Sequence, residues 1–85
     1  MYITYIIQSE KTDQFYIGQT CNLEYRLQKH NSEKVFSTKN RGPWKLIYKK
    51  TFDTRAAAMK HEKELKKIKN KRYLLELIEK EYLMA

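Results

Sequence analysis

The sequence predicts a small α/β (α+β) domain, in which a three-stranded antiparallel sheet is flanked by three helices in the order ββαβαα. Three observations lead to this prediction. Two runs rich in β-branched and aromatic residues are separated by a polar turn, a third such run follows the only proline, and helical spacing follows the second and third runs. A chain of 85 residues can bury one core. We therefore expect a single domain over residues 1–85.

The first two runs predict a β-hairpin. Residues 2–8 read YITYIIQ, residues 14–19 read QFYIGQ, and the polar stretch SEKTD lies between them. β-Branched and aromatic side chains suit a pleated, half-buried strand. Because successive side chains of a strand point to opposite faces, the register decides whether Tyr5 and Tyr16 share a face, and the turn leaves that register open.

A helix is predicted over residues 23–30, which read LEYRLQKH. Asn22 is a favourable N-cap, and Leu23 and Leu27 lie one turn apart on one face. The helix should end near Asn31. The next segment, residues 32–43, has no clean period and contains glycine and proline, so it predicts a basic loop.

The rest of the chain predicts one strand and two helices. Residues 44–52, WKLIYKKTF, have the composition of a third strand. Either Asp53 or Thr54 can cap a helix over residues 55–69, which is built from strong helix formers. The sequence then breaks near residue 70, and apolar spacing predicts a last helix over residues 71–83.

The composition is strongly basic. Eighteen Lys and Arg against ten Asp and Glu give a formal charge of +8, which favours nucleic acid as the partner. No apolar run approaches the roughly 18–20 residues that span a bilayer, and no signal-peptide pattern opens the sequence, so we expect a cytoplasmic protein with no membrane association. Cys21 is the only cysteine, which excludes an intramolecular disulfide and a zinc site built from cysteine pairs.

One carboxylate of the predicted helix over residues 55–69 faces apolar neighbours. Residues three or four positions from Glu62 form an apolar stripe, namely Ala58, Met59 and Leu65. Glu64, by contrast, has mainly polar neighbours and suits a solvated face. An inward carboxylate needs a cation or hydrogen-bond donors beside it. Glu62 is therefore paired with Arg26 or Lys66, or it lies at a solvent-exposed edge of the stripe, or it is a metal ligand at a catalytic surface.

Four further residues have both a structural and a functional interpretation. Tyr5 and Tyr16 could be half-buried strand residues with their hydroxyls at the rim of the core. Arg26 could be a solvated helix residue or a phosphate clamp. His30 could satisfy the carbonyl groups at the end of its helix. Spacing alone does not decide between these interpretations.

Taken together, these residues resemble the GIY-YIG nuclease domain, a family that includes the nuclease domain of a DNA-repair excinuclease. Residues 16–18 reproduce the second half of the motif as YIG, whereas Ile3-Thr4-Tyr5 keeps only the tyrosine of the first half. The stretch YIGQTCNLEYRLQKHN is similar to the family pattern YIG-x-T-x-x-L-x-x-R-L-x-x-H-N, with its arginine at Arg26 and its histidine at His30. The family's helix-borne glutamate falls on Glu62.

The resemblance implies a metal-dependent endonuclease with one divalent ion, Mg²⁺ or Mn²⁺. Glu62 would hold the ion, and Arg26 would contact the scissile phosphate. Tyr16 would activate or orient the attacking water and Tyr5 would support it, although a phenol with a pKa near 10 is a poor base. His30 would orient the phosphate or share the proton transfer.

DNA is the expected substrate, and six cations are candidate backbone contacts: Lys34, Lys39, Arg41, Lys60, Lys63 and Lys66. The resemblance implies weak sequence preference, branched, flapped or damaged DNA, and a role in repair or recombination. Gln19 stands where some relatives carry a lysine. Because no appended recognition domain is visible, specificity would come from this domain or from a protein partner.

Two other interpretations stay open. The chain could be a non-catalytic nucleic-acid-binding module with the same fold. It could also be a small protein-interaction domain whose basic face meets an acidic partner, but that interpretation leaves the inward orientation of Glu62 unexplained.

Overall fold

The computed structural model confirms the predicted fold class and the order ββαβαα. It describes residues 1–32, 39–68 and 70–84. The sheet is antiparallel with strand order β2-β1-β3, and its strands are β1 (Tyr2–Ser9), β2 (Phe15–Thr20) and β3 (Trp44–Phe52). Both predicted hairpin strands and the predicted third strand are therefore present.

The three helices are α1 (Leu23–Asn31), α2 (Arg55–Lys66) and α3 (Lys71–Met84). A polar side chain caps the start of each helix, and these caps are Asn22, Thr54 and Asn70. None of the helices in the described ranges is long and apolar enough to cross a membrane.

The predicted end of the helix over residues 55–69 is wrong. The helix ends at Lys66, and the backbone N–H of Lys67 bonds back to carbonyl groups of the last turn. Ile68 then packs against the core, and Asn70 already caps the next helix. Leu74 and Ile78 of α3 are buried in the same core as Leu65 of α2, so the chain turns between the two helices.

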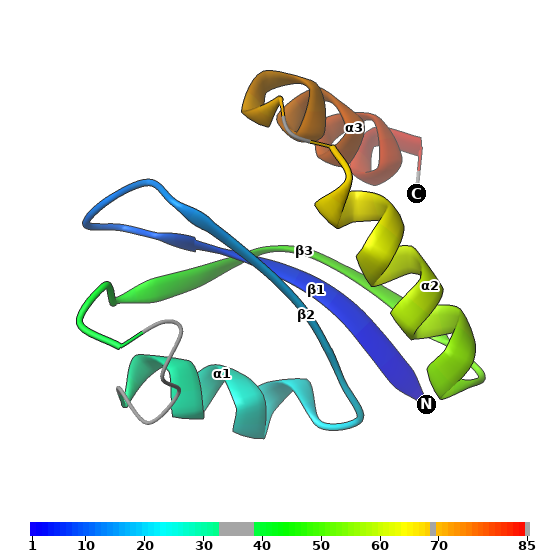
Figure 1. Ribbon diagram of the computed structural model, residues 1–85, viewed down its shortest axis with the longest axis horizontal. Helices are drawn as coiled ribbons and strands as arrows, with labels where there is room; N and C mark the ends of the chain where they lie inside the picture. Colours follow the sequence, from blue (N-terminus) through cyan, green and yellow to red (C-terminus); the bar gives the residue numbers. More distant parts are fainter. Residues whose placement is uncertain (33–38, 69, 85) are drawn as a thin grey trace.

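The helices cover both faces of the sheet, with α1 on one face and α2 and α3 on the other (Figure 1). The core on the α2 side consists of Ile6, Tyr48, Leu65, Leu74 and Ile78. The core on the α1 side consists of Tyr5, Ile7 and Trp44, with partly buried neighbours that include Tyr16 and Leu27. Successive residues of β1 thus supply the two cores alternately.

Part of the predicted apolar stripe on α2 is wrong. Ala58 and Leu65 are buried against the sheet, but Met59 is 40% exposed. Met59 follows Ala58 directly, so it lies about 100° further round the helix and points outward. The inward face of α2 therefore runs from Ala58 to Leu65, and Glu62 borders it.

The hairpin register places both motif tyrosines on the α1 face. Tyr5 pairs with Gly18, and Ile7 pairs with Tyr16. Cross-strand partners share a face, and Tyr5 and Ile7 are two positions apart, so all four positions face α1. The register that the sequence left open is thereby decided.

The Tyr5 ring lies across its partner Gly18. A Cβ atom added to Gly18 would lie 2.6 Å from the Tyr5 hydroxyl oxygen and 2.8 Å from the ring carbon that carries it. Tyr5 is only 1% exposed, so its ring has little room to move aside. The Tyr5 hydroxyl can approach the β2 edge only because position 18 has no side chain.

We expect the substitution Gly18→Ala to lower the free energy of unfolding by about 1–3 kcal/mol, because the added methyl group overlaps the buried Tyr5 ring. Urea unfolding followed by circular dichroism measures the change. Gly42→Ala is the matched control, since a Cβ atom there meets no heavy atom closer than 3.5 Å. Equal stability changes in the two variants would show that the Tyr5 ring does not constrain position 18.

Candidate active site

Tyr5, Tyr16 and His30 form an aromatic cluster between the sheet and α1. The ring centroids of Tyr16 and His30 are 4.8 Å apart, those of Tyr5 and His30 are 5.9 Å apart, and those of the two tyrosines are 6.4 Å apart. His30 is completely buried, whereas Tyr16 is partly exposed. The cluster therefore has a dry inner part and an accessible rim.

Arg26 joins this cluster from the next turn of α1. Its guanidinium hydrogen-bonds to Tyr5 and, more weakly, to Tyr16, and the bond to Tyr5 is the main reason that the pKa of Arg26 is raised. The Arg26 Nε atom is buried and has no hydrogen-bond partner among the described residues. A buried donor without a partner is costly, so this group is ready to bind an acceptor.

Burial keeps Tyr5 and His30 uncharged. It raises the pKa of the Tyr5 hydroxyl to about 12, although Arg26 counteracts this shift. Burial also lowers the pKa of His30, and together with the charge of Arg26 it brings this pKa to about 4. The Tyr5 oxygen lies 2.9 Å from His30 Nε2. Since Arg26 can only donate to Tyr5, we assign the hydroxyl proton of Tyr5 to the bond with His30.

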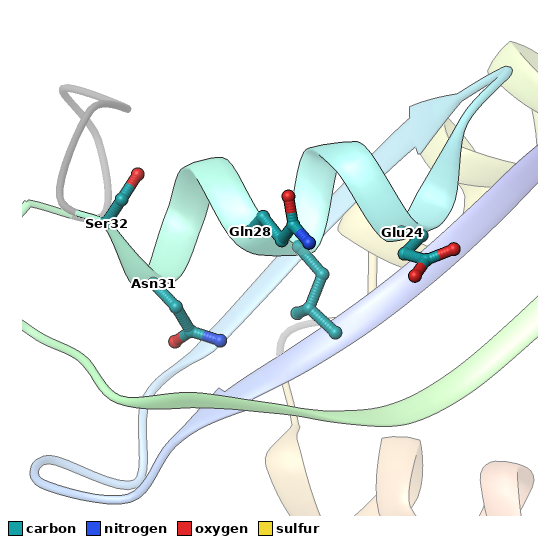
Figure 2. A pocket seen from close by; sticks show the side chains of 5 residues that line it. Glu24, Gln28, Asn31 and Ser32 are labelled. Atoms are coloured by element: carbon teal, nitrogen blue, oxygen red, sulfur yellow. The ribbon is translucent and has the colours of Figure 1, made fainter.

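Asn31 joins the end of α1 to β3. The sequence indicated this residue only as the end of a helix. The Asn31 side chain accepts a hydrogen bond from the Trp44 backbone N–H at 2.6 Å and donates one to the Trp44 carbonyl at 3.1 Å. Figure 2 shows Asn31 pointing from α1 toward β3. This contact holds the neighbouring His30 in place. The only sequence signal for the contact between Asn31 and Trp44 was an asparagine at the predicted helix end, where the family pattern also has one.

Glu62 lies on the flank of α2 that faces β2. At about 100° per residue, His61 and Glu62 fall on opposite sides of the line from Ala58 to Leu65. The His61 Nε2 atom is 2.9 Å from the hydroxyl oxygen of Tyr48, so this flank faces β3. The order β2-β1-β3 then places Glu62 on the side of β2.

Glu62 is close enough to the aromatic cluster for its charge to act on Tyr5, whose pKa it raises slightly. Its side chain is 19% exposed, and one carboxylate oxygen lies 3.5 Å from Lys66 Nζ. One of the two predicted cationic partners is therefore present. Glu64 is 57% exposed, which confirms its predicted position on the solvated face.

Glu62 is a carboxylate within electrostatic reach of the aromatic cluster, and it could hold a metal ion. Among the residues that the structure describes, no group of three or more His, Cys, Asp or Glu side chains is placed to bind a metal. A single, partly exposed carboxylate fits Mg²⁺, which usually keeps several water ligands and takes the rest from substrate phosphates. It does not fit a structural zinc site.

A hollow of about 510 Å³ lies on the other flank of α1 (Figure 2). It is lined by Glu24, Leu27, Gln28, Asn31 and Ser32. This hollow is bordered by none of the five motif residues, which are Tyr5, Tyr16, Arg26, His30 and Glu62. The hollow is wide and mostly apolar, and it is separate from the cluster at which the motif residues meet.

The predicted DNA-contacting cations occupy separate places. Lys34 lies outside the described residues. Lys39 and Arg41 are exposed in the segment before β3, and Arg41 contacts Gln14 at the hairpin turn. The other three, Lys60, Lys63 and Lys66, are exposed on α2. Lys66 is the one that contacts Glu62.

Sequence reasoning missed a second tyrosine–histidine pair. Tyr48 is 2% exposed and hydrogen-bonded to His61. The ring of His61 also lies 5.3 Å from that of Phe52, so His61 is a packed residue. Gln19 differs from the lysine of some relatives, and its side-chain oxygen is buried without a partner among the described residues.

Comparisons with known proteins identify the family of this chain. A family model described as the GIY-YIG catalytic domain matches residues 1–74. The UPF0213 protein of Syntrophus aciditrophicus (strain SB) is 42% identical over 67 residues, which cover 75% of each chain. The UPF0213 protein YsiG of Lactococcus lactis is 48% identical over 63 residues, which cover 72% of this chain and 59% of the relative.

The fold is also similar to a solved structure. The solution NMR structure of the UPF0213 protein BH0048 from Bacillus halodurans aligns with a TM-score of 0.58 and 30% identity, covering 93% of this chain and 84% of that one. The range matched by the family model, residues 1–74, contains Tyr5, Tyr16, Arg26, His30 and Glu62. This chain belongs to the GIY-YIG catalytic domain family, a family of nucleases.

Proposed function

We propose that this protein is a divalent-cation-dependent DNA endonuclease with little sequence preference. The convergence of Tyr5, Tyr16, Arg26 and His30 at one edge of the sheet, within electrostatic reach of Glu62, supports the proposal most directly. Hydrolysis of a phosphodiester needs a group that binds the phosphate, one that handles the proton of the attacking water, and a cation. These five residues can supply all three.

Arg26 would bind the scissile phosphate. Its guanidinium is held by the two tyrosine hydroxyls, and its buried Nε atom lacks a partner among the described residues. A phosphate oxygen would satisfy this donor in the geometry that guanidinium groups favour. Binding of the phosphate would therefore remove the free-energy cost of the unpartnered Nε donor and add a charge-assisted hydrogen bond.

Tyr16 would orient the attacking water and receive its proton, while its own proton passes to solvent. The water oxygen attacks phosphorus, the bond to the 3′ oxygen breaks, and the 3′ oxygen takes up a proton from solvent. Tyr16 suits this role because it is partly exposed beside Arg26. Tyr5 has a pKa of about 12 and stays protonated, so it would act as a fixed support.

Glu62 would hold the Mg²⁺ or Mn²⁺ ion, with waters and phosphate oxygens as the other ligands. When bound, the ion would offset negative charge on the phosphate and on the departing oxygen. Lys66 neutralises Glu62 in the absence of an ion and would be displaced toward solvent, where it is already 55% exposed. An inward carboxylate thus has a partner in both states.

The net charge of the protein and its family support a proposal for the substrate and for the cellular role. The formal charge of +8 favours a polyanion, and membership of a nuclease family favours nucleic acid. Branched or damaged DNA, a role in repair or recombination, a protein partner that supplies specificity and a cytoplasmic location stay predictions from the resemblance.

We expect the substitution Glu62→Gln to reduce cleavage of supercoiled plasmid in Mg²⁺ or Mn²⁺ by about 100-fold or more, because loss of the cation removes several kcal/mol of charge stabilisation. Glu64→Gln is the matched control, since it makes the same change on the solvated face of the same helix. Its cleavage rate should stay within about 2-fold of wild type. Gel electrophoresis of nicked and linear products measures both rates.

A second variant separates catalysis from binding. Arg26→Ala should reduce both cleavage and DNA affinity, whereas Glu62→Gln should still bind DNA. If the wild-type protein binds DNA but cuts none with either cation, and both variants bind equally well, the endonuclease proposal is wrong. That result would favour the non-catalytic nucleic-acid-binding module.

We expect stability to fall as the pH drops from 7 to 5, by about 2 kcal/mol from His30 alone. The pKa of His30 is about 4 in the folded protein against an ordinary value of 6.5, so the unfolded chain binds the proton first. This contribution is fully present above about pH 6.5 and is lost toward pH 4. Urea unfolding at a series of pH values measures it.

The variant His30→Gln serves as the reference for this experiment. It removes the titrating group but keeps an acceptor for Tyr5, so its stability should change less between pH 7 and 5 than that of the wild type. Parallel pH profiles for the two proteins would contradict the assignment of a buried, neutral His30.

A further inference from the structure

Tyr25 is an exposed aromatic residue immediately beside the candidate active site. It is 54% exposed, although large aromatic side chains usually bury most of their surface. Lys29 lies one turn further along α1, with its Nζ atom 4.9 Å from the centre of the Tyr25 ring. A hollow of about 250 Å³ adjoins this pair and is lined also by Gln28 and Ser32.

The geometry of α1 places this pair on the same flank as Arg26. At about 100° per residue, Lys29 falls between Tyr25 and Arg26 around the helix. Leu27 and Asn31 occupy the opposite flank, where Asn31 contacts β3. The flank of α1 that faces away from β3 therefore carries three groups in order around the helix. They are the guanidinium of Arg26 at the aromatic cluster, the ammonium of Lys29 and the exposed ring of Tyr25.

A single exposed tyrosine is common on protein surfaces and needs no function. Three features set Tyr25 apart from such a residue: the cation over its ring, the adjoining hollow, and the phosphate-binding candidate Arg26 next to it in sequence. A nucleotide has the complementary chemistry, because it combines a flat aromatic base with an anionic phosphate. The overall charge of +8 adds to this complementarity.

From this arrangement we infer that Tyr25 and Lys29 bind one unpaired nucleotide of a DNA strand, with the base stacked on Tyr25 and its phosphate near Lys29. The inference rests on the proposed function, since it places this nucleotide next to the phosphate held by Arg26. Bases inside a duplex are already stacked on their neighbours, so only an unpaired base can use the ring. The substrate is therefore DNA with a single-stranded segment beside the cleavage position.

The test measures binding of full-length protein to a fluorescent 12-nucleotide single strand and to the corresponding duplex, in EDTA so that no cleavage occurs. Tyr25→Ala should weaken single-strand binding by about 5- to 100-fold, the range expected for one stacked base, and duplex binding by less than about 2-fold. Tyr25→Trp should retain the single-strand affinity. Placing 2-aminopurine in the strand should give fluorescence quenching that Tyr25→Ala abolishes.

Tyr73→Ala is the matched control, because Tyr73 is 56% exposed on α3, on the other face of the sheet. It should change neither affinity. Lys29→Gln should weaken the binding of both the single strand and the duplex. It should also reduce the salt dependence of the affinity by the equivalent of about one released ion. Unchanged thermal unfolding of each variant shows that the fold is intact.

Two results would overturn the inference. One is unchanged single-strand affinity in Tyr25→Ala, and the other is an equal loss for single strand and duplex, which would indicate only general charge or folding effects. Both are independent of cleavage. A wild-type protein that stacks the base but cuts no DNA would contradict the proposed endonuclease and leave the nucleotide site in place.

Discussion

The contact between the Tyr5 ring and Gly18 is the constraint on which the candidate site depends. Cross-strand pairing places them opposite each other, and a Cβ atom at position 18 would lie 2.6 Å from the Tyr5 hydroxyl oxygen. Because that space is empty, the hydroxyl reaches the edge strand and meets both His30 and Arg26. The same register brings Tyr16 onto this face. A glycine in a strand usually weakens it, and here it admits the ring.

The residues of the aromatic cluster differ in how deeply they are buried, and this difference gives them different roles. Tyr5 and His30 are buried, and their pKa values move in the directions that keep each uncharged, to about 12 and about 4. A neutral hydrogen-bonded pair is a stable support in a dry environment, where an unpaired charge would be costly. Arg26 and Tyr16 lie at the rim, where they could contact a charged substrate. The arrangement separates the residues that hold the geometry from those that would contact DNA.

The two flanks of helix α2 have different roles, because its buried face includes only the line from Ala58 to Leu65. Ala58 and Leu65 are buried against the sheet, and the positions on either side of them diverge in role. His61 packs under β3 against the buried Tyr48, which anchors the helix. Glu62 borders the same face on the side of β2, where it remains partly exposed and acts on Tyr5. Anchoring one flank of the helix therefore fixes the position of the carboxylate on the other.

The sequence by itself determined the elements, their order, the Asn22 cap and the unusual position of Glu62, because strand composition, capping residues and helical spacing are local properties. It left the cap of α2 open between Asp53 and Thr54, and it indicated Asn70 only as a break. It did not determine the hairpin register, since a one-residue slip changes which face each tyrosine occupies without changing the pattern of the strand. It also missed the end of α2 and the contacts of Asn31 and His61, which depend on where α3 and β3 pack. Only the tertiary structure decided which residues share a site, because that depends on contacts between segments far apart in the chain.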